Sequence, residues 1–232
     1  MKIVFDLGGV AIQWIPKSFI TDLCGQNPTQ SNLDQAFDAV FQNFSVDSDW
    51  SQFDCNKLTI QQLAALIHKR LNAYELERYV SEKHIIEWIS FLPRQMLPIE
   101  ETLEWLEQLR SEGIPLYFLS NMPQPFVPSL LFNDRLFSKF DDGIFSCDVG
   151  FAKPFVKIFE IAAERFDFTN GDRVIFIDDN VTNVEAEENS AGMQSTTFPF
   201  NKVVRHSDSS FEVINFLSDK AGSSAVLLRA QP

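Results

Sequence analysis

The sequence predicts an α/β fold: a parallel sheet covered by helices, with a helical subdomain inserted after the first strand. Two observations support this prediction. Short runs rich in β-branched and aromatic residues alternate with segments of helical periodicity, which is typical of right-handed βαβ crossovers and a parallel sheet. The long stretch between the first two runs, residues 17–94, carries only helical patterns.

Composition narrows the class of protein and of partner. The chain has 232 residues, 45% of them hydrophobic, and its 23 Phe can fill a large core. A formal net charge of -13 would repel nucleic acid and anionic membranes. We therefore expect no nucleic acid and no membrane partner.

Location is inferred from the cysteines and from the apolar runs. Cys24, Cys55 and Cys147 are widely spaced and show no metal-ligand spacing, so we expect reduced thiols in a cytoplasmic protein. A strand predicted from residue 2 leaves no room for a signal peptide. No apolar run reaches the roughly 18 residues that a membrane span needs.

The predicted strands are apolar runs bounded by glycine, proline or polar residues. They are Lys2–Phe5, Pro115–Leu119, Gly143–Ser146, Arg173–Ile177 and a fifth at Gln194–Phe198 that Pro199 stops.

The inserted stretch contains at least three predicted helices. One has the apolar stripe Phe37, Val40, Phe41 and Phe44. A second begins at the capping box Thr59–Gln62, and a third covers residues 75–92 and stops at Pro93.

Four further helices are predicted outside the insert. One covers Ile99–Glu112 and ends at Gly113. A second has Pro154 in its first turn and buries Phe155, Phe159, Ala162 and Phe166. The capping box Thr182–Glu185 starts a third that ends near Gly192, and Ser209–Glu212 starts a last short one.

These elements divide the chain into three parts. Residues 1–14 and 95–205 form the core, residues 15–94 form a helical cap over the carboxyl edge of the sheet, and residues 206–232 form a C-terminal helix and tail.

Polar clusters follow the predicted strands or precede helices, and the carboxyl ends of parallel strands share one edge of a sheet. The clusters are Asp6, Ser120–Asn121, Lys153 and Asp178–Asp179. Each one taken alone is typical of a turn, a surface loop or a helix cap. Together they suit the transfer of a phosphoryl group. We therefore expect a small-molecule phosphate substrate, and we expect the protein to be a monomer or homodimer.

Asp6 is the predicted nucleophile, because a carboxylate that accepts a phosphoryl group splits one hard step into two. Asp6, Asp179 and the backbone carbonyl of Gly8 offer the oxygen ligands that Mg2+ prefers. Asp178 is expected to support this metal site rather than to bind the ion.

The phosphoryl oxygens need donors and positive charge. Ser120 and the backbone N–H of Asn121 are predicted to donate hydrogen bonds to them. Lys153 is predicted to supply a fixed positive charge, both as a binding group and as a catalytic group.

These residues fall in four motifs that resemble those of the haloacid dehalogenase superfamily. The motifs are Asp6–Val10, Leu119–Asn121, Ala152–Pro154 and Phe176–Asn180, and the resemblance covers residues 1–14 and 95–200. The resemblance implies a Rossmann-like core, an aspartyl nucleophile and, in most members, Mg2+-dependent phosphatase activity. The position and size of the insert resemble those of members with a helical cap.

One departure from the family pattern concerns the proton donor. Most phosphatases of the family carry a second Asp two residues after the nucleophile, where this chain has Gly8. We therefore expect an activated substrate such as a sugar 1-phosphate, and the motif is similar to that of the α-D-glucose-1-phosphate phosphatase group. Alternatively a cap residue donates the proton; Asp54 and Asp49 are the nearest choices, although we expect both to be solvated surface acids.

Two other functions stay open. A carbon–halogen hydrolase of the same superfamily also lacks the second Asp, but it works without metal and does not usually carry paired acids in the fourth motif. A weakly active phosphate-binding regulatory member is the other. Trp14, Trp50 and Phe53 could form a wall for the substrate, although we expect all three to belong to the core of the cap.

Overall fold

The computed structural model describes residues 1–25, 28–76, 80–169, 172, 174–180, 182, 183, 186, 200–204, 206, 207, 210 and 211. The strands are β1 (Lys2–Phe5), β2 (Leu116–Ser120), β3 (Asp142–Phe145), β4 (Val174–Ile177), β5 (Phe200–Val204), β6 (His206–Ser207) and β7 (Ser210–Phe211). The α-helices are α1 (Pro16–Cys24), α2 (Gln30–Phe41), α3 (Asp49–Asp54), α4 (Ile60–Ala73), α5 (Glu82–Phe91), α6 (Glu100–Ser111), α7 (Val127–Leu131), α8 (Asp134–Phe137), α9 (Ser146–Val149) and α10 (Val156–Arg165).

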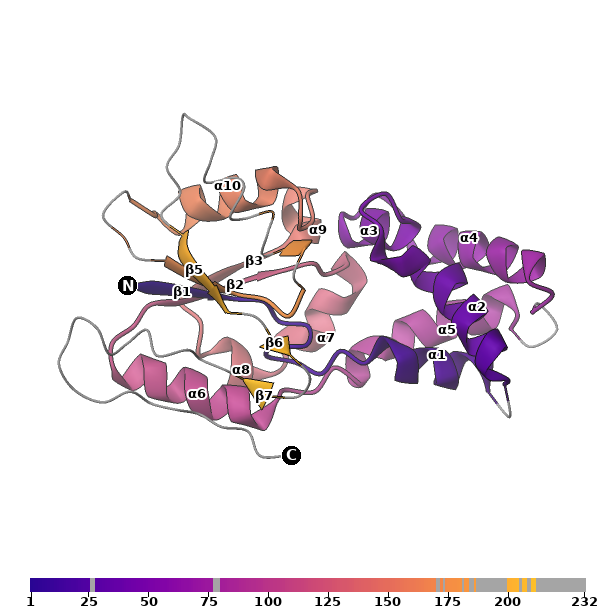
Figure 1. Ribbon diagram of the computed structural model, residues 1–232, viewed down its shortest axis with the longest axis horizontal. Coiled ribbons are helices and arrows are strands. Elements are labelled where there is room, and N and C mark those ends of the chain that lie inside the picture. The colour runs from indigo at the N-terminus through magenta and orange to yellow at the C-terminus, as the bar shows by residue number, and fades with distance from the viewer. Residues whose placement is uncertain are drawn as a thin grey trace.

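The main sheet has five parallel strands in the order β3-β2-β1-β4-β5 (Figure 1). The predicted α/β class and parallel sheet are confirmed. The first four strands lie within one residue of their predicted bounds. The fifth strand was predicted at residues 194–198, which are not among the described residues, and β5 itself was not predicted. Because β1 is central, the residue that follows it lies in the middle of the carboxyl edge.

Two apolar layers cover the faces of this sheet. Alternate residues of β1 point to opposite faces: Val4 packs in the cluster of α10, whereas Ile3 and Phe5 pack in the cluster of α6. In Figure 1, α10 lies above the sheet and α6 lies below it. The cluster that contains α6 also contains the buried residues of α1–α5, so the sheet and these helices share one core.

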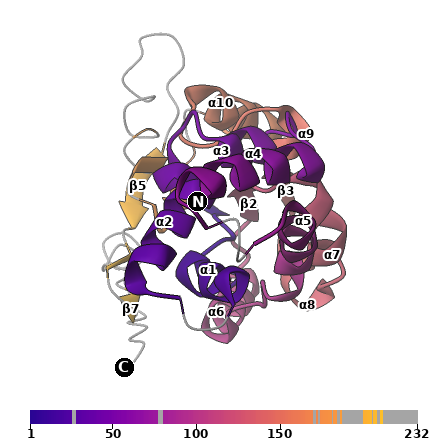
Figure 2. The ribbon, with the colours of Figure 1, turned by 90° about the vertical axis from the view of Figure 1, so that its right-hand side faces the viewer.

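Helices α1–α5 gather at the carboxyl end of the sheet (Figures 1 and 2). We call these five helices the helical insert. The predicted capping box is confirmed: Thr59 Oγ1 accepts from the Gln62 N–H at 3.2 Å, and Gln62 Oε1 accepts from the Thr59 N–H at 2.9 Å. The apolar side of α4 is buried through Leu63, Ala64, Ile67 and Leu71.

Two predicted helices of the insert have different bounds. The stripe that was predicted to include Phe44 ends at Phe41, because Gln42, Asn43 and Phe44 adopt positive φ angles of 48°, 53° and 54°. As a result Phe44 is 41% exposed. Helix α5 begins at Glu82, not at residue 75, and Ser81 caps it by accepting from the His84 N–H.

The structure also differs from the predictions outside the insert. Helix α10 begins after Phe155, so Pro154 precedes the helix and Phe155 is exposed instead of buried. Helices α7 and α8, between β2 and β3, were not predicted. Ser210–Phe211 is strand β7, paired with β6 in an antiparallel hairpin, not the start of a helix. The end of the helix predicted near Gly192 and residues 212–232 are not among the described residues.

In the described part of the chain, no helix combines the length and the apolar character needed to cross a bilayer.

A substitution at Leu63 tests whether packing of the shared core stabilises the helical insert. The Leu63 side chain is fully buried in α4. We expect Leu63→Ala to lower the free energy of unfolding by about 2–5 kcal/mol, because it leaves a cavity that the neighbouring helices fill only in part. Urea denaturation measures this change. The exposed Gln61→Ala on the same helix should stay within about 0.5 kcal/mol of wild type, and equal midpoints for the two variants would contradict the packing described here.

Candidate active site

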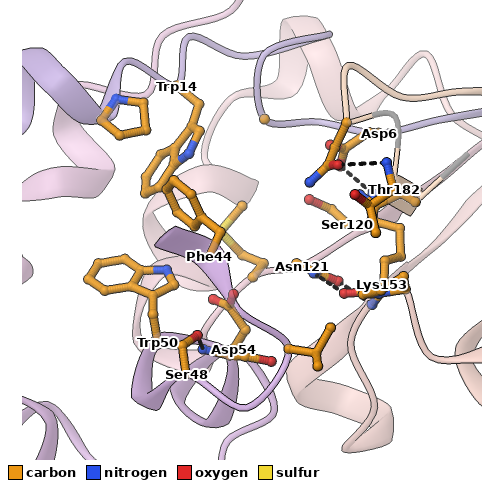
Figure 3. A pocket seen from close by; sticks show the side chains of 18 of the residues that line it. Asp6, Trp14, Phe44, Ser48, Trp50, Asp54, Ser120, Asn121, Lys153 and Thr182 are labelled. Atoms are coloured by element: carbon orange, nitrogen blue, oxygen red, sulfur yellow. Dashed lines mark hydrogen bonds and ion pairs between the residues drawn. The ribbon is translucent and has the colours of Figure 1, made fainter. Parts of the chain in front are cut away.

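A cavity of about 680 Å³ lies between the carboxyl edge of the sheet and the helical insert. The sheet edge contributes Asp6, Ser120, Lys153 and Asp179. The opposite side contributes three aromatic residues, Trp14, Phe44 and Trp50, and one acid, Asp54 (Figure 3). The structure therefore brings the predicted site residues together from four separate parts of the chain.

Lys153 is a buried cation between two carboxylates. Its Nζ lies 2.9 Å from Asp6 Oδ1 and 2.6 Å from Asp178 Oδ2. Burial alone would lower the pKa of Lys153, but the charges of Asp178 and Asp6 outweigh it and raise that pKa. The ammonium is therefore charged at neutral pH and offsets part of the negative charge at the sheet edge.

The backbone of Lys153 is fixed by Asn121. The Lys153 N–H donates to Asn121 Oδ1 at 2.7 Å, and Asn121 Nδ2 donates to the Lys153 carbonyl at 2.8 Å. The side chain of Asn121 thus orients the lysine. Ser120, the last residue of β2, is buried and lines the cavity beside it.

Asp6 follows β1 and is held on both sides. Its N–H donates to the Ile177 carbonyl of β4 at 2.7 Å, and the Leu7 N–H donates to its Oδ1 at 2.7 Å. The pKa of the Asp6 carboxyl is raised to about 7: burial raises it most, Lys153 opposes the rise, and the charges of Asp178 and Asp179 add to it. A second positive charge beside Asp6 would favour its ionised form.

The acids beside Asp6 fit a divalent cation. Asp6, Asp178 and Asp179 each offer a carboxylate oxygen, and these oxygens lie within 4.8 Å of one another. Both oxygens of Asp178 already accept hydrogen bonds, from Lys153 Nζ, Asn183 Nδ2 and the Asn180 N–H. Oxygen donors of this kind suit Mg2+. Asp6 and the exposed Asp179 are the acids best placed to bind it, and Asp178 supports the site.

Two glycines follow Asp6, and the local geometry requires only the second of them, Gly9. Its φ is +75°, and a Cβ at this position would collide with the carboxylate of Asp179. Gly8 is different: its φ is not left-handed, and a Cβ there would lie at an ordinary 3.6 Å from Trp14 Cβ. Only Gly9 is required by the backbone and by the close approach of the acid.

Asp54 was expected to be a solvated surface acid, and this expectation is wrong. Asp54 ends α3, is only 7% exposed and lines the cavity with Asp6 and Lys153. Asp49 instead forms an ion pair with Arg70. No local sequence pattern could have identified Asp54, because its burial results from contact between the insert and the sheet edge.

The wall of the cavity opposite the sheet edge is aromatic. Trp14, Phe44 and Trp50 line it (Figure 3). Phe53 does not; it is fully buried and packs edge-on against Trp50 and Phe126, with ring centroids 5.9 and 6.0 Å apart. As expected, Trp50 and Phe53 are buried in the core and Trp14 packs against it, but Trp14 and Trp50 also line the cavity.

Comparison with known protein families identifies one family that matches most of this chain. The family model described as haloacid dehalogenase-like hydrolase matches residues 3–189. No curated protein matches this chain.

Several solved structures share the fold at low sequence identity. An L-2-haloacid dehalogenase from Xanthobacter autotrophicus has a TM-score of 0.59 at 17% identity, covering 82% of this chain and 74% of that one. Another structure, described as a dehalogenase, has a TM-score of 0.61 at 17% identity, with 82% and 80% covered.

A third structure is a haloacid dehalogenase family enzyme from Bacteroides thetaiotaomicron in complex with magnesium and inorganic phosphate. Its TM-score is 0.55 at 20% identity, with 82% and 89% covered. At such identities these structures show the fold alone. Because the family match covers most of the chain, the protein belongs to the haloacid dehalogenase-like hydrolases and is a hydrolase.

Proposed function

We propose that this hydrolase is a Mg2+-dependent phosphatase that acts on a small phosphorylated metabolite through an aspartyl-phosphate on Asp6. The observation that carries the proposal is the placement of Asp6: its carboxylate contacts a buried ammonium on one side and lies beside a second, exposed acid, Asp179, on the other.

The residues of the sheet edge divide the reaction between them. A carboxylate oxygen of Asp6 attacks phosphorus, and the bond to the leaving oxygen breaks. The hydroxyl of Ser120, the backbone N–H of Asn121 and the Lys153 ammonium stabilise the charge on the phosphoryl oxygens. Water then attacks phosphorus, which releases phosphate and restores the Asp6 carboxylate.

Asp6, Asp179 and the Gly8 carbonyl are the groups that would hold Mg2+. When bound, Mg2+ reduces the repulsion between the Asp6 carboxylate and the anionic phosphate.

Charge favours a phosphatase over a carbon–halogen hydrolase. The family includes both activities, and the compared structures include dehalogenases as well as a complex with magnesium and phosphate. Without a bound cation, an extra acid such as Asp179 next to the nucleophile raises the pKa of Asp6 and so disfavours the ionised form that attacks the carbon. The same acid has a direct use if a cation is bound.

A sugar 1-phosphate is the substrate class that we propose first. Its anomeric leaving oxygen is more acidic than that of a simple alcohol, which suits a site with no acid at Gly8. The cavity, about 680 Å³ with Trp14 and Trp50 in its lining, suits a small ring. The net charge of -13 makes nucleic acid a poor alternative partner.

The first prediction concerns metal and nucleophile. We expect hydrolysis of phosphate esters that needs Mg2+, stops with chelator, and falls by at least about 10³-fold in Asp6→Asn. The exposed Asp22→Asn should retain wild-type rates. Phosphate release across a panel of phosphorylated metabolites measures the activity, and capture of beryllofluoride at Asp6 measures the site separately.

The competing functions give other results in the same experiment. Halide release from a haloacid that continues in the presence of chelator would establish the carbon–halogen hydrolase instead. A beryllofluoride adduct without turnover on any ester would indicate a phosphate-binding regulatory protein.

The second prediction concerns Lys153 as a structural cation. We expect Lys153→Met to lower the free energy of unfolding by about 3–5 kcal/mol in metal-free buffer at neutral pH, because Asp6 and Asp178 lose the cation between them. Urea denaturation measures the loss. The exposed Lys157→Met on α10 is the matched control and should change it by no more than about 0.5 kcal/mol. If the two variants are equally stable, the carboxylates do not depend on the lysine.

A further inference from the structure

The helical insert places one acid, Asp54, over the sheet edge. It is the last residue of α3, and it lines the cavity that Asp6, Ser120 and Lys153 line from the other side. Figure 3 shows Asp54 among the side chains that surround this cavity. A phosphate ester held by the sheet edge would therefore have its leaving group on the side of the cavity where the insert lies.

Buried hydrogen bonds tie the backbone of Asp54 to the core. Its carbonyl accepts from Ser146 Oγ at 2.7 Å, and the same Oγ accepts from the Met122 N–H at 2.8 Å. Ser146 begins α9 directly after β3, and Met122 follows the end of β2. The end of α3 is thus fixed relative to the strands that carry the site. The edge-on contact of Phe53 with Phe126 adds an apolar link at the same place.

The surroundings of the Asp54 carboxyl favour its protonated form. Among the described residues no cation forms an ion pair with it, and Lys153 is bound to Asp6 and Asp178. Burial raises the pKa of Asp54 well above its ordinary value; the charge of Asp6 raises it further, and Lys153 lowers it. A carboxyl whose pKa is raised in this way keeps its proton nearer to neutral pH.

The loop after the nucleophile has no group that transfers protons. Gly8 occupies the position of the second family Asp, and Trp14 lies against it. Asp49, the other acid considered for this role, is paired with Arg70 and does not line the cavity.

On the basis of the phosphatase function, we propose that Asp54 is the general acid of this enzyme, supplied by the helical insert in place of the acid missing at Gly8. As Asp6 attacks phosphorus and the ester P–O bond breaks, the Asp54 proton passes to the leaving oxygen and gives the alcohol. The Asp54 carboxylate then takes a proton from the water that attacks the aspartyl-phosphate. The bond between phosphorus and Asp6 breaks, phosphate leaves, and both acids return to their starting forms.

Two esters of similar size separate this role from a structural one. A general acid matters for benzyl phosphate, whose leaving group is an alkoxide, and little for 4-nitrophenyl phosphate, whose leaving group is already acidic. We expect Asp54→Asn to lower kcat/KM for benzyl phosphate by about 10²–10⁴-fold and for 4-nitrophenyl phosphate by less than about tenfold.

Control variants make the test specific. The exposed Asp47→Asn, in the loop before α3, should match wild type on both esters. Mg2+ affinity, measured by calorimetry, should be the same in Asp54→Asn and wild type. Adding Gly8→Asp to Asp54→Asn should raise kcat/KM for benzyl phosphate at least tenfold above that of Asp54→Asn alone, because the Gly8 backbone accepts a Cβ.

The outcomes against the proposal are distinct. Equal losses on both esters in Asp54→Asn, or no loss on either, overturn the role of Asp54 and leave the phosphatase function standing. A wild-type protein that hydrolyses neither ester, nor any metabolite of the panel, overturns both proposals together.

Discussion

The contact of the Lys153 ammonium with two buried carboxylates is the interaction on which the site depends. Removing a carboxylate from water costs several kcal/mol per ion unless a cation and hydrogen bonds replace the solvent. Lys153 contacts Asp6 and Asp178 at 2.9 and 2.6 Å, and its backbone is held by the side chain of Asn121. The strand ends can therefore place acids side by side in the interior. A single change at Lys153 affects the fold and the chemistry at once.

The residues at the sheet edge were predictable because local sequence patterns place them there. Asp6 and Ser120 directly follow or end apolar runs, and parallel strands bring such positions to one edge whatever the helices between them do. The same holds for the Thr59 capping box, in which a residue and its third neighbour decide the helix start. Asp178 was predicted as a supporting acid, and its hydrogen bonds with Asn183 show the contacts through which it can support the site.

Features that depend on contacts between distant residues could not be predicted from the sequence. The hydrogen bond between Ser146 and the Asp54 carbonyl joins residues 92 positions apart, so nothing near Asp54 marks it as buried. In the sequence, the apolar stripe continues from Phe41 to Phe44 with no glycine or proline between them. In the structure the helix ends at Phe41, because the backbone becomes left-handed at Gln42. At Ser210, strand pairing in a hairpin overrode a local pattern typical of a helix start.

The sheet edge and the opposite wall of the cavity have different roles in the proposed reaction, and these roles follow from their geometry. The loop after β1 is constrained at Gly9, whose φ is +75° and which the Asp179 carboxylate approaches, whereas Gly8 would accept a Cβ but carries no side chain. Because Gly8 has no group that transfers protons, the proton donor that we propose comes from the opposite wall. Helix α3 supplies that wall with Trp50 and Asp54, which are four residues apart and so share one face of the helix. Because one short helix carries both the aromatic wall and the acid, any shift of α3 that alters how a leaving group is received also moves the group that would protonate it. On this view, substrate choice and proton delivery are a single property of the helical insert.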